Sequence, residues 1–435
     1  MMVKKEEQEI LIITPVSSRS SSFNFNQKLD LQTDKVVTFN SLESSDVTLQ
    51  NINKLLNRSR KIAVLTGAGI SCNAGIPDFR SSTGLYDLVK KEFPGLTIRS
   101  GQEMFDISLF RDELKISVFA SFMEKLYSSV RLAKPTKTHK FIAHLKDRSK
   151  LLRCYTQNID GLEENLGLEM SKRELTSDRS SGFSSTWKNF DVIQLHGDLN
   201  TLSCTRCFHI YDWNRYLARS FRRGELPNCP GCAEKNRKRV EEGKRNIDII
   251  GFLRPNIVLY GENHPSSEFI SQGLNLDIIK GKPDFLIILG TSLKVDGVKK
   301  VVKQMSKQVH ERGGIVILVN KTVLADSQWA GIIDYQICSD CDSWVTYLES
   351  EIPDFFKTQD QINRLRVLKR EASELRKLKK QEPQSLNMML KTPPTTPIGK
   401  DEPLSLEDSE MNDIKRRLLD DCCFNDENTK RVKVE

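Results

Sequence analysis

Short apolar runs alternate with amphipathic segments through the middle of this chain. Five of the runs have the length of a buried strand, and Gly, Asn or His follows each of them within two residues. These runs cover residues 62–66, 151–156, 192–195, 285–289 and 315–319. Periodic apolar segments, typical of helices, lie between them. Near-continuous apolar strands separated by helices indicate a parallel sheet covered on both faces. The pattern therefore predicts an α/β fold with a Rossmann-like, doubly wound parallel sheet.

The regions around this core differ from it in composition. Residues 1–48 lack a sustained period, which predicts a flexible N-terminal extension. The folded domain is expected over 49–350, with a Ser-rich surface insertion at 169–189 and a smaller inserted module at about 200–252. Residues 351–435 are predicted to form a charged helix and then a disordered tail, because several prolines exclude regular structure there.

Composition limits the class of protein. Apolar residues make up 38% of the 435, below the share in globular domains, and polar tails account for the difference. No stretch approaches the roughly 20 apolar residues of a membrane span, so no membrane association is expected. The first residues lack the apolar core of a secretory signal. The protein is therefore expected to be soluble and intracellular, where ten cysteines are not expected to form a disulfide framework.

Four of the cysteines are spaced as metal ligands. Cys204 and Cys207 form one CxxC pair, Cys229 and Cys232 form another, and 21 residues separate the pairs. Four thiolates at such spacing suit a closed, tetrahedral, structural zinc site. A redox role for CxxC is an alternative, although it would not need two pairs. A closed site has no open coordination position, so this zinc is not expected to be the catalyst.

Positive charge is concentrated around the cysteines. The chain has a net charge of +8, and residues 206–254 contain twelve Lys or Arg against six Asp or Glu. A basic surface of this kind suits nucleic acid or another polyanion. An ordinary solvated face explains the same charges equally well.

A glycine-rich loop follows the first predicted strand. It runs from Gly67 to Arg80 as GAGISCNAGIPDFR, and glycines at such a turn let backbone N–H groups approach a phosphate. As a dinucleotide fingerprint it is imperfect, because the third glycine of GxGxxG would fall at Cys72. Taken alone, the first two glycines are as consistent with a plain turn. Polar residues follow the other strands too, and ligands bind at the carboxyl ends of parallel strands.

The whole string is more specific than its glycines. GAGISCNAGIPDFR resembles the sirtuin signature GAGxSxxxGIPDFR at every fixed position, and four further family blocks follow in order. They are Gln157-Asn158-Ile159-Asp160, His196-Gly197, Arg254–Glu262 and Gly290-Thr291-Ser292. The resemblance covers about residues 50–350. It implies an NAD-dependent protein lysine deacetylase with a Rossmann-like domain and a structural zinc.

The resemblance also implies roles for individual residues. Sirtuins cleave NAD at the nicotinamide–ribose bond and release nicotinamide, O-acetyl-ADP-ribose and deacetylated lysine. His196 is implied as the general base for a ribose hydroxyl, a task to which imidazole is suited. Asn158 and Asp160 are implied in catalysis and in the nicotinamide pocket. The other implied NAD contacts are Gly67, Ala68, Gly69, Ile76, Asp78, Phe79, Arg80, Gln157, Gly290, Thr291, Ser292, Asn320 and Cys341.

An extended substrate peptide is implied along the block that begins at Arg254. Main-chain pairing with such a peptide gives affinity with little sequence selectivity. An apolar tunnel walled by Phe79, His196 and Val258 would favour a neutral acetyl-lysine, because burying an unpaired ammonium is costly. The expected partner is an acetylated histone or another acetyl-lysine protein. The residues implied to form the pairing edge are Val258, Leu259, Tyr260, Gly261 and Glu262.

Features outside the motifs narrow the resemblance. The polar tails, the Leu259-Tyr260 variant and the basic module are most like the fungal nuclear branch that deacetylates histone H3 in chromatin silencing and genome maintenance. Basic clusters at 415–417 and 430–433 resemble a bipartite nuclear import signal, so a nuclear location is expected. The basic module around the cysteines is a candidate for contact with nucleosomal DNA.

Alternative functions remain open on the same residues. An ADP-ribosyltransferase or a remover of longer acyl groups would share the NAD site. A catalytically silent chromatin scaffold would bind through the zinc module and the tails, although it has no reason to keep His196, Asn158 and Asp160 together. A zinc-ribbon protein that binds nucleic acid leaves the NAD motifs unexplained.

Overall fold

The computed structural model consists of two compact units, residues 1–366 and residues 367–435. Both sheets lie in the first unit. Phe79, Arg80 and the two basic tail clusters lie outside the described residues. The described residues are 10–13, 37–39, 47–78, 91, 101–171, 182–246, 250–324 and 327–381.

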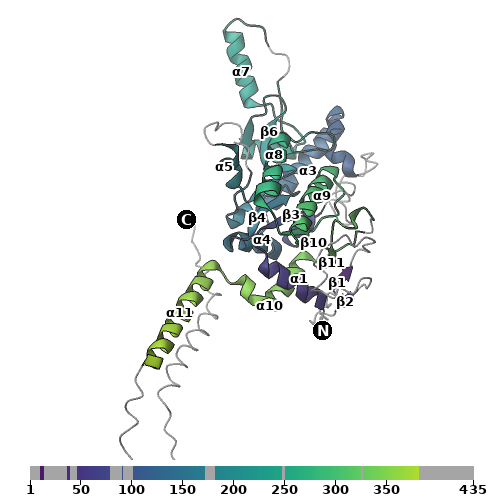
Figure 1. Ribbon diagram of the computed structural model, residues 1–435. Coiled ribbons are helices and arrows are strands. Elements are labelled where there is room, and N and C mark those ends of the chain that lie inside the picture. Colours follow the sequence, from purple (N-terminus) through teal and green to yellow (C-terminus); the bar gives the residue numbers. More distant parts are fainter. Residues whose placement is uncertain are drawn as a thin grey trace, which may run out of the picture. The chain divides into compact units, whose positions relative to one another are not determined.

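The larger sheet has eight strands in the order β2-β1-β11-β10-β9-β3-β4-β5 (Figure 1). The six strands from β11 to β5 are mutually parallel. Their bounds are β3 Ile62–Thr66, β4 Leu151–Thr156, β5 Val192–Gln194, β9 Phe285–Leu289, β10 Ile315–Asn320 and β11 Tyr335–Cys338. The parallel sheet predicted from the apolar runs is confirmed, and β11 is a sixth parallel strand that the pattern did not predict.

Helices cover both faces of this sheet, because each central strand presents apolar side chains on both sides. Ile62 and Val64 of β3 pack in a core with α1, α4 and α10. Ala63 and Leu65 belong to the opposite core, with α8 and α9, which Figure 1 shows in front of the strands. The fold is therefore doubly wound, as predicted. The helix bounds are α1 Val47–Arg58, α4 Lys137–Asp147, α8 Ser267–Leu276, α9 Asp296–Glu311 and α10 Cys341–Glu351.

A second, antiparallel sheet has the order β7-β6-β8. Cys204 ends its central strand, and Cys229 and Cys232 stand at the start of the helix Pro230–Glu241. The helix α3 packs against α6 beside it. None of the residues of α7 is buried, and Figure 1 shows this helix extending beyond β6. The region predicted to form a smaller inserted module contains this three-stranded sheet and the two helices α6 and α7. The bounds are α3 Glu113–Leu132, β6 Gly197–Cys204, β7 Ile210–Asp212, α6 Arg215–Arg222, α7 Pro230–Glu241 and β8 Leu253–Ile257.

Two short strands extend the larger sheet beyond β11. The strand β1 (Ile10–Ile13) pairs antiparallel with β11, and β2 (Val37–Phe39) pairs with β1. Both differ from the flexible extension predicted over 1–48. The sequence of β1 is Ile-Leu-Ile-Ile, whose side chains favour a strand and whose main chain can pair with the exposed edge of β11. Four residues were too few to stand out as a periodic segment.

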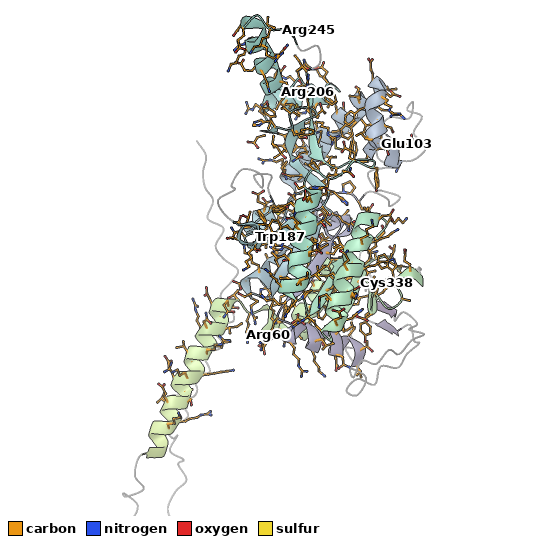
Figure 2. The ribbon with its side chains drawn as sticks, turned by 45° about the horizontal axis from the view of Figure 1, so that its top comes forward. Arg60, Glu103, Trp187, Arg206, Arg245 and Cys338 are labelled. Carbon is orange, nitrogen blue, oxygen red and sulfur yellow. The ribbon has the colours of Figure 1, made fainter. Side chains whose placement is uncertain are left out.

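Trp187 anchors part of the stretch predicted to be a surface insertion. It lies on α5 (Phe183–Lys188), is fully buried, and its ring centroid is 5.3 Å from that of Phe269 on α8 (Figure 2). The guanidinium of Arg153 lies over the Trp187 ring at 5.1 Å. The prediction of a surface insertion is therefore wrong for α5, because aromatic residues within the Ser-rich stretch bury themselves against α8.

An aromatic segment lies between α10 and the last described helix. Phe355, in the short 3-10 helix Pro353–Phe356, is fully buried. Nη1 of Arg148 donates to the main-chain oxygens of Phe355 at 2.6 Å and Lys357 at 2.8 Å. The charged helix α11 (Gln359–Gln381) follows, where a charged helix was predicted. Among the described residues, no helix has both the length and the apolar character to span a membrane.

Candidate active site

The main chains of the loops after β3 and β9 contact each other directly, and this close approach requires glycine. The Gly69 N–H donates to the Gly290 carbonyl at 2.9 Å, and the Gly67 N–H donates to the Leu289 carbonyl at 3.0 Å. A Cβ on Gly67 would lie 2.7 Å from Cβ of Thr291, and one on Gly69 would lie 2.7 Å from Cα of Gly290. Gly290 also has a φ of 61°, which favours glycine. The predicted phosphate-binding glycines thus meet at the carboxyl ends of neighbouring strands.

A chain of buried hydrogen bonds links the loops after β3 and β4. The Ser71 hydroxyl donates to Oδ2 of Asp160 at 2.7 Å, and Nδ2 of Asn158 donates to Oγ of Ser71 at 3.1 Å. The Asn158 N–H donates to Oγ1 of Thr156, which also accepts from Thr66. All five side chains are buried. Hydrogen bonds in such a low-dielectric setting hold Asn158 and Asp160 in one geometry.

A small cavity opens beside this chain of hydrogen bonds. Its volume is about 20 Å³, and its lining includes Ala68, Ile76, Asn158 and Asp160, which were all predicted to contact NAD. Oδ1 of Asn158 is buried and has no hydrogen-bond partner among the described residues. A buried acceptor without a donor costs about 1–3 kcal/mol, so a ligand N–H placed here would be stabilised. A carboxamide carries such a donor.

His196 follows β5, and the main chain after β4 orients its ring. Nδ1 lies 2.9 Å from the Gln157 carbonyl oxygen, which can only accept, so Nδ1 carries a proton. In the neutral ring the basic lone pair is then on Nε2. The His196 carbonyl accepts from the Val258 N–H at 2.9 Å, which ties this residue to the predicted substrate block. The main chain thus selects the tautomer that a general base at Nε2 requires.

The remaining predicted NAD contacts lie along the same edge of the sheet. Nε2 of Gln157 donates to Oγ1 of Thr291 at 2.9 Å and joins the loops after β4 and β9. Asn320 ends β10, and its side-chain amide donates to the Thr322 carbonyl at 2.9 Å. Cys341 begins α10 and is buried, and this burial raises the pKa of its thiol. A protonated thiol is a poor nucleophile. It is compatible with the predicted contact of Cys341 with NAD, which would use the main chain.

The predicted substrate block, residues 258–262, is tied to its own protein. The Tyr260 N–H donates to the Phe105 carbonyl at 2.7 Å. The Leu259 N–H donates to a carboxylate oxygen of Glu262 at 2.9 Å, and the Leu259 carbonyl accepts from the Glu262 N–H at 3.1 Å. These main-chain groups are used within the protein. The edge that could pair with a peptide is therefore narrower than the sequence predicted.

The four cysteine thiols meet in the small module. The sulfurs of Cys204 and Cys232 are 3.7 Å apart, as are those of Cys207 and Cys229. All four lie within 4.8 Å of one another. Zn–S bonds of about 2.3 Å in a tetrahedron place sulfurs about 3.8 Å apart, so the spacing fits zinc. The N–H groups of Cys207 and Cys232 donate to sulfurs at 3.4 Å and 3.5 Å, as thiolates require.

The module itself stabilises one of these thiolates. Burial opposes ionisation of Cys229, but the Tyr211 hydroxyl and the Cys232 N–H lower its pKa to about 7. Burial raises the pKa of Cys207 to about 12. Oη of Tyr211 accepts from the Gly231 N–H at 3.1 Å and lies 3.2 Å from the Cys229 sulfur, so its proton is available to that sulfur. A divalent cation would supply the charge that lets all four thiols ionise.

Sequence reasoning missed the residues that support Asp160. Ser71 is a fixed position of the signature, but its hydrogen bonds to residues 87 and 89 positions away required the fold. His139 and Glu163 are buried beside Asp160, and no short motif marks them. Asp78 and Ser292 are described and lie in the loops after β3 and β9. The roles of Phe79 and Arg80 stay predictions, because both lie outside the described residues.

Comparison with known proteins identifies relatives along most of the chain. Residues 67–176 and 178–297 match the Sir2 family. The NAD-dependent histone deacetylase HST3 of Saccharomyces cerevisiae is 62% identical over 417 residues, which are 93% of this chain and 92% of that protein. The protein of the same name from Candida albicans is 53% identical over 73% of this chain and 65% of its own length.

More distant relatives share the domain and the fold. The human NAD-dependent protein deacetylase sirtuin-1 is 32% identical over 68% of this chain and 32% of its own length. A solved complex of a mutant Sir2 homologue with 2′-O-acetyl ADP ribose has a TM-score of 0.50 and 22% identity over 71% of this chain and 98% of that chain. That likeness concerns the fold and agrees with the parallel sheet. The chain belongs to the Sir2 family, the sirtuins, and within it to the fungal HST3 and HST4 branch.

Proposed function

We propose that the protein is an NAD-dependent protein lysine deacetylase that acts on acetylated histone. Two relatives at 62% and 53% identity are named NAD-dependent histone deacetylases, which supports both the cofactor and the substrate class. Histone H3 is the histone that the sequence resemblance implies. Removal of its acetyl groups serves chromatin silencing and genome maintenance, and it requires the enzyme in the nucleus.

The observation that carries this proposal is the tautomer of His196. A general base must present a lone pair toward its substrate, and the Gln157 carbonyl reserves Nδ1 so that Nε2 provides it. Asn158 and Asp160 follow the neighbouring strand and line the adjacent cavity. With NAD bound, Nε2 of His196 would act as the base for a ribose hydroxyl.

The residues at the strand ends fit NAD. Bound NAD would supply an electrophilic ribose carbon and nicotinamide as a leaving group. Asn158 would hold the nicotinamide carboxamide, because its buried Oδ1 is without a donor. The loops at Gly67 and Gly290 would hold the phosphates through their N–H groups. Asn320 and Cys341 stand at the end of the next strand, on the side proposed for the adenosine.

The substrate and the zinc have separate roles in this account. The carbonyl of Val258 and the main chain of Gly261 would pair with an extended peptide beside His196. Phe79 would shield the reacting carbon from water, which competes with acyl transfer. The four cysteines would hold a structural zinc that keeps the small sheet folded, since they leave no open position for catalysis.

One experiment separates the candidate activities. Purified full-length protein is mixed with an acetylated histone H3 peptide, with and without NAD, and mass spectrometry follows both peptide and cofactor. A deacetylase releases nicotinamide only with peptide and forms O-acetyl-ADP-ribose in equal amount to the acetyl lost. ADP-ribose attached to protein would instead support a transferase. Removal of longer acyl groups alone would support a long-chain deacylase. No use of NAD with any acyl peptide would support a silent scaffold.

We also propose that the basic module contacts nucleosomal DNA. The exposed basic residues of α6 and α7 include several that form ion pairs, such as Arg222 with Glu124 and Arg237 with Glu234. Figure 2 labels two basic residues of the module outside these helices, Arg206 before α6 and Arg245 just after α7, and neither forms an ion pair with a described carboxylate. The exposed basic residues without an ion pair to a described carboxylate are Arg206, Arg215, Arg219, Lys235 and Arg245.

The unpaired residues give the sharper test of DNA contact. Changing Arg215, Arg219, Lys235 and Arg245 to Ala should weaken duplex DNA binding and flatten its dependence on salt, because each phosphate contact contributes about one unit to the slope. Changing the paired Arg222, Arg223, Arg237 and Lys238 to Ala removes the same number of positive charges and is the matched control, which should have a smaller effect. The hypothesis is wrong if the first variant binds DNA with unchanged salt dependence.

The proposed nuclear location has its own test. The basic clusters at 415–417 and 430–433 lie outside the described residues, and their sequences resemble a bipartite import signal. Replacing the basic residues of both clusters with Ala should move a fluorescent fusion of the chain out of the nucleus. Unchanged nuclear accumulation would show that these clusters are not the import signal.

A further inference from the structure

Three ionisable side chains are packed together behind the Asn158 pocket. A ring nitrogen of His139 and one carboxylate oxygen each of Asp160 and Glu163 all lie within 4.8 Å of one another. His139 and Glu163 are fully buried, and Asp160 is 5% exposed. The imidazole comes from α4, and the two acids come from the loop after β4. Because Asp160 also lines the pocket, a charge in this cluster acts at the proposed active site.

Hydrogen bonds fix which nitrogen of His139 carries the proton. Nδ1 lies 3.2 Å from the backbone N–H of Thr136, which can only donate, so Nδ1 is an acceptor. The Thr136 hydroxyl lies 2.8 Å from the same nitrogen and 3.0 Å from the Ile70 carbonyl oxygen, so its proton is within reach of both acceptors. The proton of the neutral ring is therefore on Nε2. This N–H is buried with the two acids and has no hydrogen-bond partner in the described part of the chain.

Glu163 lacks the donors that a buried carboxylate needs. Neither of its side-chain oxygens has a hydrogen-bond partner among the residues described. Asp160 is different, since Oδ2 accepts from Ser71 at 2.7 Å and Oδ1 accepts from the Leu162 N–H at 3.1 Å. Burial and then repulsion from Asp160 raise the pKa of Glu163 to about 8. Its own backbone N–H and the Thr156 hydroxyl oppose this rise, but neither reaches hydrogen-bond geometry with the carboxylate. Of the two acids, only Asp160 has hydrogen-bond donors among the described residues that would stabilise a negative charge.

The other ionisable groups around the cluster bring no positive charge. Burial lowers the pKa of the His139 imidazole against the opposing effects of Asp160 and of Asp342 on α10, so the ring stays neutral. Burial and then Glu163 raise the pKa of the Cys154 thiol on β4, so it stays protonated. None of the groups that act on Glu163 is positively charged. Among the described residues, no cation that acts on Glu163 would compensate a second carboxylate.

We propose that Glu163 is a positioning residue that is held protonated, and that its neutrality keeps Asp160 in its hydrogen bond with Ser71. An ionised Glu163 would place a second negative charge within 4.8 Å of Asp160, and the two would repel. Ser71 would then lose its acceptor, and Asn158, which donates to Ser71, would lose its fixed orientation in the pocket. The inference rests on the proposed function, because it assigns the cluster to the pocket proposed for nicotinamide. Deacetylation should therefore fall as Glu163 ionises.

A pH profile of three full-length proteins tests this proposal. We expect kcat/KM of the wild type for an acetylated H3 peptide to fall about tenfold per pH unit above about 8. Glu163→Gln has a side chain of the same shape that cannot ionise, so it should keep activity at pH 7 within about threefold and lose the alkaline decline. Glu164→Gln removes the same charge from the exposed neighbouring residue and should follow the wild type. An alkaline decline that is unchanged in Glu163→Gln overturns the proposal.

Infrared spectroscopy of the wild type tests it independently of activity. A buried protonated carboxyl should give a C=O band that is lost as pH rises through about 8 and is missing in Glu163→Gln. If wild-type protein shows no such band at neutral pH, the proposal is wrong even for an active enzyme. If the band is present but no peptide is deacetylated at any pH, the proposed function is wrong, although Glu163 is protonated as proposed. A second bound metal ion per chain would overturn the proposal, because a cation at the cluster would keep both acids ionised.

Discussion

The four-cysteine cluster and the buried His139–Asp160–Glu163 cluster satisfy the same geometric condition, since the ligand atoms of each lie within 4.8 Å of one another. Their surroundings differ. In the cysteine cluster, backbone N–H groups and the Tyr211 hydroxyl reach the sulfurs, and Cys207 is exposed. In the buried cluster, both oxygens of Glu163 and Nε2 of His139 lack partners in the described part of the chain.

Proximity of ligand atoms alone does not make a metal site. A site that holds a cation must stabilise deprotonated ligands, and the cysteine module does so with N–H groups aimed at sulfur. The buried cluster provides donors for only one of its two acids, Asp160. We therefore expect the first cluster to hold a metal and the second to hold a proton. Four changes test this contrast, in order of decreasing effect.

Loss of a cysteine ligand should have the largest effect. Cys229→Ala should abolish zinc binding and unfold the sheet β7-β6-β8, because structural zinc contributes about 10 kcal/mol or more to folding. Metal analysis and limited proteolysis measure the two consequences. Cys338→Ala, which removes a thiol outside the cluster, should retain the zinc. Full zinc content in Cys229→Ala would contradict the assignment.

Loss of the Ser71 hydroxyl should come next. Ser71→Ala leaves a buried donor on Asn158 and a buried acceptor on Asp160 without their partner. We expect it to lower the free energy of unfolding by about 2–4 kcal/mol, measured by denaturant titration. Ser129→Ala is the control, because it removes one exposed hydrogen bond and should cost about 0.5 kcal/mol or less. Equal effects of the two changes would show that the buried chain is not rigid.

The stability of Glu163→Gln should depend on pH differently from that of the wild type. The pKa of Glu163 rises from 4.5 to about 8 on folding, so the folded state binds the proton more tightly. Wild-type stability should therefore fall as pH rises from about 4.5 through about 8. Glu163→Gln should lack this loss and be more stable than the wild type by a few kcal/mol at alkaline pH. His139 is neutral in the folded protein because burial lowers its pKa. The stability that this costs at acid pH should therefore be lost equally in both proteins.

Thermal or denaturant unfolding at several pH values measures that difference. The comparison of interest is the free energy of unfolding of the variant minus that of the wild type. It should increase steadily from acid to alkaline pH. A constant difference would mean that Glu163 ionises alike in the folded and unfolded chain.

Tyr211→Phe should have the smallest effect. It removes the hydroxyl that contacts the Cys229 sulfur and accepts from the Gly231 N–H, while all four metal ligands remain. Loss of such an outer partner should weaken zinc binding about tenfold, which competition with a chelator measures. No change in affinity would mean that the cysteines alone define the site.

Much of the fold could be predicted because its strands are continuous apolar runs. The strands β3, β4 and β9 begin and end at the predicted residues. The strand β11 was missed because it has only four residues, one of them the buried Gln336. The three-stranded sheet was missed because β6 mixes polar and apolar residues, Gly-Asp-Leu-Asn-Thr-Leu-Ser-Cys. Such strands depend on pairing with partners far along the chain.

The site residues likewise fall into those that the sequence predicted and those that it did not. Motif spacing located the cysteines, His196, Asn158 and the glycines, since each belongs to a short ordered block. It could not locate His139 and Glu163, whose properties come from burial by separate elements rather than from neighbours in sequence. Nor could it foresee that Tyr260 pairs with Phe105, because that hydrogen bond joins segments about 150 residues apart.

The most direct test of the central claim compares the wild type with His196→Ala in the NAD-dependent reaction on an acetylated H3 peptide. The wild type should lose acetyl groups and release nicotinamide in equal amounts. His196→Ala should fold normally and deacetylate at least about a hundredfold more slowly, because it lacks the base at Nε2. A His196→Ala protein that deacetylates at the wild-type rate, or a wild type that removes acetyl groups without NAD, would contradict the account.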